Sequence, residues 1–206
     1  MAINFLIFQV IVLLFSAILH EYMHGWMADQ LGDTTAKDAG RLTLNPLPHI
    51  DPFGSVFLPL LLLFTSSPFV FGWAKPVPFD PRNLRDRKYG SAKVAFAGPF
   101  GNLIVALFFG LALRFLPLSG NELLGGLLAI VVQINLLLMI FNLVPIPPLD
   151  GSKVIAPFLP VAWQDVIYRW EHYGMFLVIF FVMFGFGVLL PAVNFLFGLI
   201  TGIKAL

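Results

Sequence analysis

Long apolar runs separated by short polar segments dominate the pattern of residues along the chain. Four runs are long enough for a membrane-spanning helix, which needs about 20 apolar residues: 4–27, 91–115, 122–144 and 174–203. The last run is overlong and contains Gly185, Gly187 and Pro191, so it is either one tilted helix or a helix broken near Pro191. The pattern predicts an all-α polytopic membrane protein with about four to six transmembrane helices.

A fifth apolar run, residues 53–73, lies between the first two predicted helices and contains Pro59 and Pro68. Its flanks, GRLTLNPLPHIDPFG and FGWAKPVPF, are rich in proline, glycine and strand-forming residues, a composition typical of short strands or loops. The run could cross the membrane, or it could enter and return as a re-entrant, partly β-hairpin-like segment. Non-helical backbone is tolerated at that depth only against protein or a wet cavity.

The composition indicates a membrane environment for the whole chain. Hydrophobic residues make up 59% of the 206 residues and charged residues 11%, against roughly 25% charged in typical soluble domains. Lipid must therefore be the solvent for much of the surface, and the length fits a single membrane-embedded domain, 1–206. The absence of cysteine excludes thiolate metal sites, and a net charge of +1 gives no broad basic surface for nucleic acid.

Candidate chemistry lies near the end of the first predicted helix, in the sequence His20-Glu21-Tyr22-Met23-His24. Residues four apart lie on one face of a helix, so the two histidines can bind one tetrahedral Zn²⁺. Glu21 follows the first histidine and can take a proton from metal-bound water and later pass it to a leaving amine. Ionisable residues inside membrane helices are usually functional. The alternative is a set of interfacial side chains that face lipid headgroups.

A catalytic zinc site needs a third protein ligand, and Asp150 is the best candidate. It follows the third predicted helix, after a proline-rich stretch that prevents an ordinary helix, and it precedes Gly151, which allows an unusual turn. The alternative is that Asp150 caps the N-terminus of the next helix. The two roles can coexist.

As a set, three segments resemble the site-2 protease family of intramembrane zinc metalloproteases, in its compact prokaryotic form. They are the helix with His20-Glu21-x-x-His24, the helix start Ala97-Gly98-Pro99-x-x-Asn102, and the segment Asn142-x-x-Pro145…Leu149-Asp150-Gly151. The resemblance covers about residues 5–173. Many members carry a PDZ domain, and no soluble segment of this chain is long enough to hold one.

The resemblance implies that His20, His24 and Asp150 bind one zinc ion per chain and that Glu21 is the general base. It also implies that Asn142 stabilises the oxyanion or orients the substrate, where an amide donor makes physical sense. The alternative for Asn142 is a hydrogen bond between helices, which is the role we expect for Asn102.

The implied function is an endopeptidase that cleaves peptide bonds in or near transmembrane segments of membrane proteins, as in regulated intramembrane proteolysis. Its partners would be transmembrane protein substrates and the lipid bilayer. Two other functions stay open. One is a membrane transporter for metal ions or protons, and the other is a catalytically idle scaffold with the same fold.

The metal site also makes a demand on topology. His24 lies near the exit end of the first helix and Asp150 lies just past the exit end of the third, so the two ends must face the same side. That requires an even number of crossings between them, and we therefore predict that residues 53–73 do not cross. An exposed strand within 41–49 or 72–79 could then hold an unwound substrate by β-addition.

The expected location is the cell membrane, as a multi-pass protein with the active site nearer the cytoplasm. The positive-inside rule supports this side because the concentrated basic residues follow the re-entrant run: Lys75, Arg82, Arg85, Arg87, Lys88 and Lys93. The remaining single residues are weaker signals. His49 and His172 are expected in a loop and at the membrane interface, and Asp29, Asp33 and Asp38 are expected to be solvated loop charges.

Overall fold

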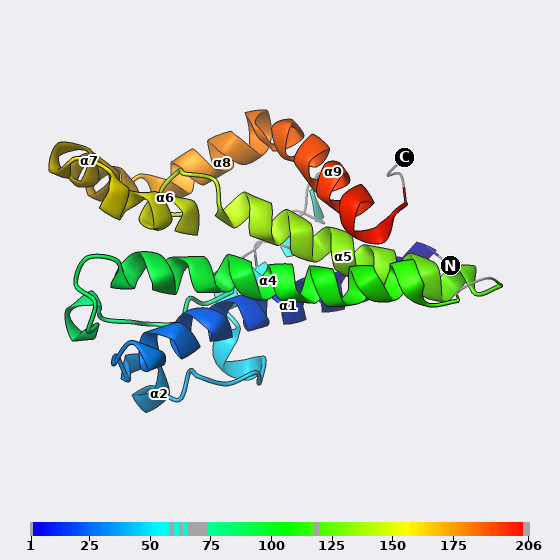
Figure 1. Cartoon of the computed structure of the whole chain (residues 1–206), viewed down its shortest axis with the longest axis horizontal. Helices are drawn as coiled ribbons and strands as arrows, with labels where there is room; N and C mark the ends of the chain where they lie inside the picture. Colours follow the sequence, from blue (N-terminus) through cyan, green and yellow to red (C-terminus); the bar gives the residue numbers. More distant parts are fainter. Residues whose placement is uncertain (1, 58–59, 62–63, 66–73, 118–119, 204–206) are drawn as a thin grey trace.

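A computed structural model describes residues 2–57, 60–61, 64–65, 74–117 and 120–203. Within these ranges every regular element is helical, which agrees with the predicted all-α class. Three long helices lie side by side, and α4 runs in the opposite direction to α1 and α5 (Figure 1). Their bounds are Ala2–Gln30 for α1, Gly90–Phe115 for α4 and Glu122–Asn142 for α5.

Small residues on α4 allow this helix to approach its neighbours closely, as is common where helices pack in membranes. A Cβ added to Gly101 would lie 2.7 Å from Met23 Cγ on α1, and one on Gly110 would lie 2.4 Å from Ile200 Cγ2 on α9 (Leu189–Thr201). A buried apolar cluster lies between α4, α5 and α9. Its residues are Ala106, Leu113, Val132, Leu136, Met139, Val193, Phe197 and Ile200.

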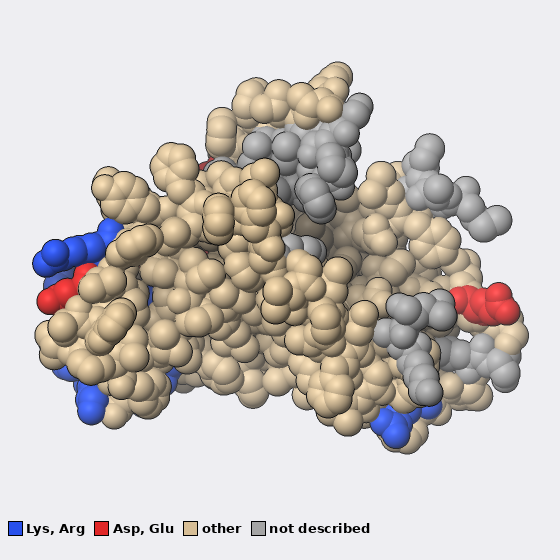
Figure 2. Space-filling view, turned by 90° about the horizontal axis from the view of Figure 1, so that it is seen from above, with Lys and Arg blue, Asp and Glu red and all other residues tan. Residues whose placement is uncertain are grey.

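Three helices are long and apolar enough to cross a membrane, over Phe5–Gln30, Gly90–Phe115 and Glu122–Asn142. A fourth span results if α7 (Val161–Glu171) and α8 (Gly174–Phe184), which are bent by 86°, are counted as one broken span. In Figure 2, charged residues gather toward the two ends of the long axis, and the centre of this face is almost free of them. The chain is thus a helical membrane protein, with three or four candidate spans among the described residues.

The apolar run predicted over residues 174–203 is divided. It forms α8, a 3₁₀ turn at Phe186–Val188 and α9, which begins two residues before Pro191. Of the two alternatives for this run, the structure therefore has the break. Neither part alone reaches the roughly 20 residues that a span requires, so the expected count of four to six spans is not confirmed.

The segment between α1 and α4 contains only short helices in its described part. They include α2 (Thr35–Asp38), a 3₁₀ turn at Leu47–His49, a π-helical turn at Pro52–Phe57 and a 3₁₀ turn at Pro81–Asn83, and residues 60, 61 and 64 are also helical.

The expected β-hairpin is not confirmed, because no strand occurs in residues 41–49 or 74–79; residues 72 and 73 lie outside the described ranges. Prolines explain why no ladder forms. Those at positions 46, 48, 76 and 78 have no N–H to donate. A single backbone hydrogen bond, from Lys75 N to His49 O (2.8 Å), joins the two stretches.

This segment begins and finishes at the same end of the bundle, since α2 and the start of α4 lie together there (Figure 1). That agrees with the prediction that residues 53–73 make no net crossing. Residues 58–59, 62–63 and 66–73 of the predicted re-entrant run lie outside the described ranges. With α4 and α5 as the two crossings, the end of α1 and the start of α6 (Asp150–Ile155) share one end of the bundle.

Candidate metal centre

His20 and His24 on α1 and Asp150 at the start of α6 come together inside the helical bundle. The two histidine rings are perpendicular, with their centroids 4.6 Å apart. Asp150 Oδ2 lies 3.0 Å from His20 Nε2 and 3.3 Å from His24 Nε2. The three candidate ligand atoms all lie within 4.8 Å of one another, and solvent reaches little of any of the three side chains.

Hydrogen bonds on the far side of each ring determine which nitrogen carries the proton. His20 Nδ1 lies 2.7 Å from Asn102 Oδ1, and His24 Nδ1 lies 2.7 Å from the carbonyl oxygen of Val94. Both partner oxygens can only accept, so each Nδ1 must be the donor. In the neutral ring, each Nε2 then presents a lone pair toward Asp150.

This donor set fits a metal cation. Both Nε2 atoms lie within 3.3 Å of one carboxylate oxygen, and their lone pairs and the negative charge repel one another unless a positive charge lies between them. A tetrahedral zinc ion with bonds of about 2.0–2.2 Å holds its ligand atoms roughly 3.4 Å apart. The observed separations of 3.0 and 3.3 Å are close to this value. His20, His24 and Asp150 therefore could hold one zinc ion.

Asn102 connects the site to all three long helices. Its Nδ2 donates to the carbonyl oxygen of Ser16 on α1 (3.2 Å) and to Asn135 Oδ1 on α5 (3.0 Å). Because the amide nitrogen donates to these two oxygens, Oδ1 is the atom that faces His20 and accepts from its Nδ1. Asn102 and Asn135 are both fully buried. Asn102 thus forms the expected bond between helices, and it also orients a candidate ligand.

Two glycines let the backbone approach closely enough to build the site. A Cβ at Gly98 on α4 would lie 2.5 Å from His24 Nε2 and 2.7 Å from His20 Cε1. A Cβ at Gly151 would lie 2.2 Å from the carbonyl oxygen of Leu143 at the end of α5. Any side chain at the first position would occupy the space of the histidine rings. At the second it would push α6, and Asp150 with it, away from α5.

Glu21 is half-buried next to His20 in the chain, and its Oε2 accepts a hydrogen bond from Val77 N (2.7 Å). Asn142, the last residue of α5, is also half-buried, and its Nδ2 donates to the carbonyl oxygen of Leu138 one turn earlier (3.0 Å). The structure thus places Glu21 against the segment before α4. The role of Asn142 in substrate binding stays a prediction.

The expectation that Asp33 is a solvated charge is wrong. Asp33 is fully buried and accepts hydrogen bonds from Asp80 N (2.7 Å), Asn83 Nδ2 (3.0 Å) and Thr35 N (3.2 Å), as well as from the Thr35 hydroxyl. Burial raises the pKa of this carboxyl, but the donors together outweigh burial and hold the pKa below its usual value. Asp33 therefore fastens the segment before α4 to the end of α1.

Sequence reasoning also missed Asn135 and the carbonyl of Val94. An isolated asparagine in an apolar helix is a usable signal for Asn135, whereas no side-chain pattern identifies a backbone carbonyl. His49 is buried with its Nε2 2.8 Å from the carbonyl oxygen of Thr43, away from the metal group. His172 is exposed at the end of α7.

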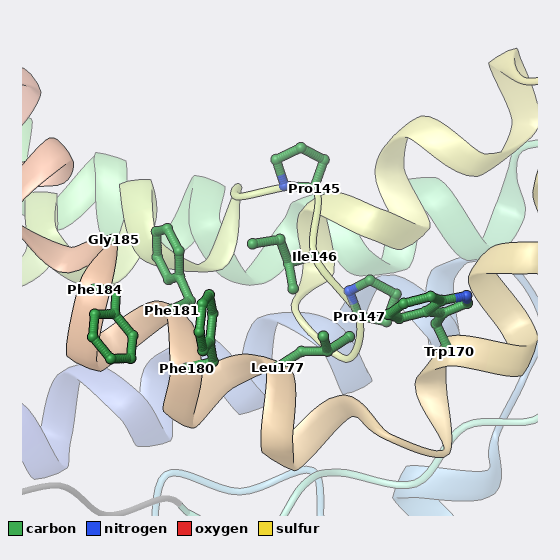
Figure 3. A pocket seen from close by; sticks show the side chains of 9 residues that line it. All are labelled: Pro145, Ile146, Pro147, Trp170, Leu177, Phe180, Phe181, Phe184 and Gly185. Carbon is green, nitrogen blue, oxygen red and sulfur yellow. The ribbon is translucent and has the colours of Figure 1, made fainter.

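An apolar pocket of about 440 Å³ lies beside the loop that precedes Asp150 (Figure 3). Loop residues form one wall and the aromatic side of α8 forms another, with Trp170 from the end of α7. Its lining is Pro145, Ile146, Pro147, Trp170, Leu177, Phe180, Phe181, Phe184 and Gly185. The pocket contains none of the candidate metal ligands.

Fold and site together define a helical membrane protein with a buried His-His-Asp group that could hold a metal ion. The chain is 38% identical over 196 residues to the Bacillus subtilis protein named "Putative zinc metalloprotease YwhC". The match covers 91% of this chain and 86% of YwhC. It is 30% identical over 167 residues to "Putative zinc metalloprotease Rip2" of Mycolicibacterium smegmatis, covering 81% of this chain and 62% of Rip2.

A shorter match, 42% identical over 77 residues, is to "Putative zinc metalloprotease MJ0611" of Methanocaldococcus jannaschii, and it covers 37% of this chain and 38% of that protein. No family model and no solved structure matches the chain. Through its likeness to YwhC, the chain belongs to the site-2 protease-like family of zinc metalloproteases.

Proposed function

We propose that the chain is an intramembrane zinc metallo-endopeptidase that cleaves peptide bonds in or near transmembrane segments of membrane proteins. The observation that carries the proposal is the convergence of His20 Nε2, His24 Nε2 and Asp150 Oδ2 inside a bundle of apolar helices long enough to span a membrane. The names of the relatives support a zinc protease. They do not favour a metal transporter or an idle scaffold.

In this proposal His20, His24 and Asp150 hold the ion, and Asn102 and Val94 fix the two rings so that each Nε2 faces it. Zinc, when bound, polarises the scissile carbonyl and lowers the pKa of a water molecule. Glu21 takes a proton from that water and transfers it to the leaving amine.

Asn142 is proposed to bind the carbonyl oxygen of the substrate, where negative charge develops as the peptide bond is attacked. Its Nδ2 donates to Leu138 O (3.0 Å), which leaves the second amide hydrogen for a substrate. The position of Asn142 at the end of α5, on the same side of the bundle as the start of α6, supports this role.

We also propose a multi-pass location in the cell membrane with the metal centre nearer the cytoplasm. The end of α1, which carries His24, and the start of α4 lie toward the end of the bundle that carries the basic segment between Lys75 and Lys93, and such segments stay on the cytoplasmic side.

Because the chain has no cysteine, a single cysteine introduced at the exposed Arg87 can be labelled selectively. A membrane-impermeant thiol reagent should reach it only in opened cells, and labelling in intact cells would contradict this orientation.

Cleavage itself is tested by producing the wild-type chain and Glu21→Gln in the same membranes and identifying new protein termini by mass spectrometry. The proposal expects new termini within or next to transmembrane segments for the wild type and for the matched control Glu122→Gln, and none for Glu21→Gln. The same termini in Glu21→Gln, or their absence from every sample, would contradict the proposal. A transporter instead predicts zinc flux into liposomes that persists in Glu21→Gln.

A further inference from the structure

The segment Lys75–Phe79 crosses one face of α1 at the position of Glu21. Gly25 lies one turn after Glu21 on the same face, and a Cβ at Gly25 would lie 2.9 Å from Val77 Cγ1. Val77 is buried, and its N–H donates to Glu21 Oε2 (2.7 Å). The glycine thus makes room on α1 for the Val77 side chain, whose own N–H reaches the Glu21 carboxylate.

Val77 is also the one residue of the triplet Pro76-Val77-Pro78 that has a backbone N–H to donate. The flanking prolines confine this stretch to extended conformations. The triplet therefore presents a single donor from a stiff backbone, and that donor faces Glu21.

The segment is fastened on both sides of Val77. Before it, Lys75 N donates to the carbonyl oxygen of His49 (2.8 Å), and Arg41 Nη2 donates to that of Lys75 (2.8 Å). After it, Asp80 N donates to the buried carboxylate of Asp33 (2.7 Å). These anchors hold the Val77 N–H in place independently of Glu21.

We propose that Val77 is a positioning residue whose backbone N–H orients the general base Glu21; this inference rests on the proposed function. With Oε2 held by Val77, Oε1 is the atom that accepts the proton from water. Lys75–Phe79 is thus part of the catalytic machinery and more than a connecting loop.

The contact can be tested without activity by amide hydrogen exchange of the purified full-length protein in detergent. Glu21→Ala should raise the exchange rate of the Val77 amide about tenfold or more, whereas Glu122→Ala should not. The Lys75 amide, which is bonded to His49, is the internal control and should stay protected in both variants. An unchanged Val77 rate in Glu21→Ala would overturn the proposal.

The catalytic consequence is tested with Val77→Pro, which removes the N–H from a stretch that is already extended, and with Val77→Ala, which shortens the side chain and keeps the N–H. The probe is a tagged single-span protein taken from the cleaved proteins of the termini experiment. A general base contributes roughly 10²–10⁴-fold, so we expect kcat of Val77→Pro to fall on the order of tenfold or more below Val77→Ala, with KM and zinc content unchanged. Equal kcat values in the two variants would overturn the inference. Absence of cleavage by the wild type would instead contradict the proposed function. The hydrogen-exchange rate of the Val77 amide would then still test the contact between Val77 and Glu21.

Discussion

Asn102 Oδ1 on α4 accepts a 2.7 Å hydrogen bond from His20 Nδ1 on α1, and both side chains are buried. This bond fixes the proton on Nδ1 and points Nε2 at the metal position. Loss of such an outer partner typically lowers metal affinity 10–100-fold. We therefore expect Asn102→Ala to bind zinc 10–100-fold more weakly than wild type, as measured by competition with a chelator of known affinity.

Asn135 provides a graded comparison, because it contacts Asn102 and not His20. Asn135→Ala should weaken zinc binding less than Asn102→Ala does. Asn194→Ala, at an exposed position of α9, should bind zinc as the wild type does. Unchanged affinity in Asn102→Ala would mean that the His20 ring does not depend on this bond.

Gly98→Ala should abolish zinc binding, because the added methyl would lie 2.5 Å from His24 Nε2. The neighbouring side chains here are the rings that must stay in place, so the clash cannot be relieved cheaply. Zinc content of the purified variant is the measurement. The matched control is Gly126→Ala on α5, where no atom lies within 4 Å of the added Cβ. A full complement of zinc in Gly98→Ala would show that the rings can shift without loss of the site.

The sequence predicted most reliably those features that depend on spacing within one helix. The long apolar runs predicted the three spanning helices to within a few residues, and the four-residue spacing of His20 and His24 predicted that they share one face. Asp150 required more: the need for a third ligand, its position after the proline-rich stretch that follows the third helix, and the family resemblance. The structure brings it to the two histidines, while the ligand role itself stays a prediction.

Features that depend on packing between helices could not be predicted in this way. Asn135 meets Asn102 only because α4 packs against α5. Burial of Asp33 depends on donors from Asp80 and Asn83, about fifty residues later in the chain. The expected strands were predicted from the strand preference of the residues in these stretches. That preference did not account for the prolines, which lack the backbone N–H groups that a β-ladder needs.

Asn142→Ala should lower kcat about 10²-fold, the usual cost of removing one donor to a developing oxyanion. Zinc content and KM should be unchanged, since Asn142 contacts Leu138 and not the metal ligands in the structure. The measurement is cleavage of the same tagged single-span protein, with Asn194→Ala as the matched control. If kcat is unaffected, Asn142 has a structural role within the helical bundle.

Acid should release the segment before α4 through Asp33. Its pKa is lowered in the folded protein from the ordinary value of 3.8. The stabilisation is therefore fully present above pH 3.8 and is lost as the pH falls through the lower folded value. We expect protection of the Asp80 amide against hydrogen exchange, corrected for the intrinsic pH dependence of exchange, to be constant from pH 7 to 5 and to fall below about pH 4.

Asp33→Asn should lose this protection already at pH 7, because the amide Nδ2 is a donor and would face neighbouring groups that themselves donate to the wild-type carboxylate. The loss of a buried hydrogen-bond partner costs about 1–3 kcal/mol. Asp38→Asn, at an exposed position, should behave as the wild type. Equal Asp80 protection in Asp33→Asn and wild type at pH 7 would contradict the anchoring role of Asp33.

The account depends on one zinc ion held by His20, His24 and Asp150, and the most direct test is the zinc content of purified variants by elemental analysis. Wild type, Glu21→Gln and the exposed control His172→Ala should each contain one zinc ion per chain. His20→Ala, His24→Ala and Asp150→Ala, when folded as judged by circular dichroism, should contain almost none. One zinc ion per chain in a folded Asp150→Ala or His24→Ala variant, or none in the wild type after purification with zinc present, would contradict the account.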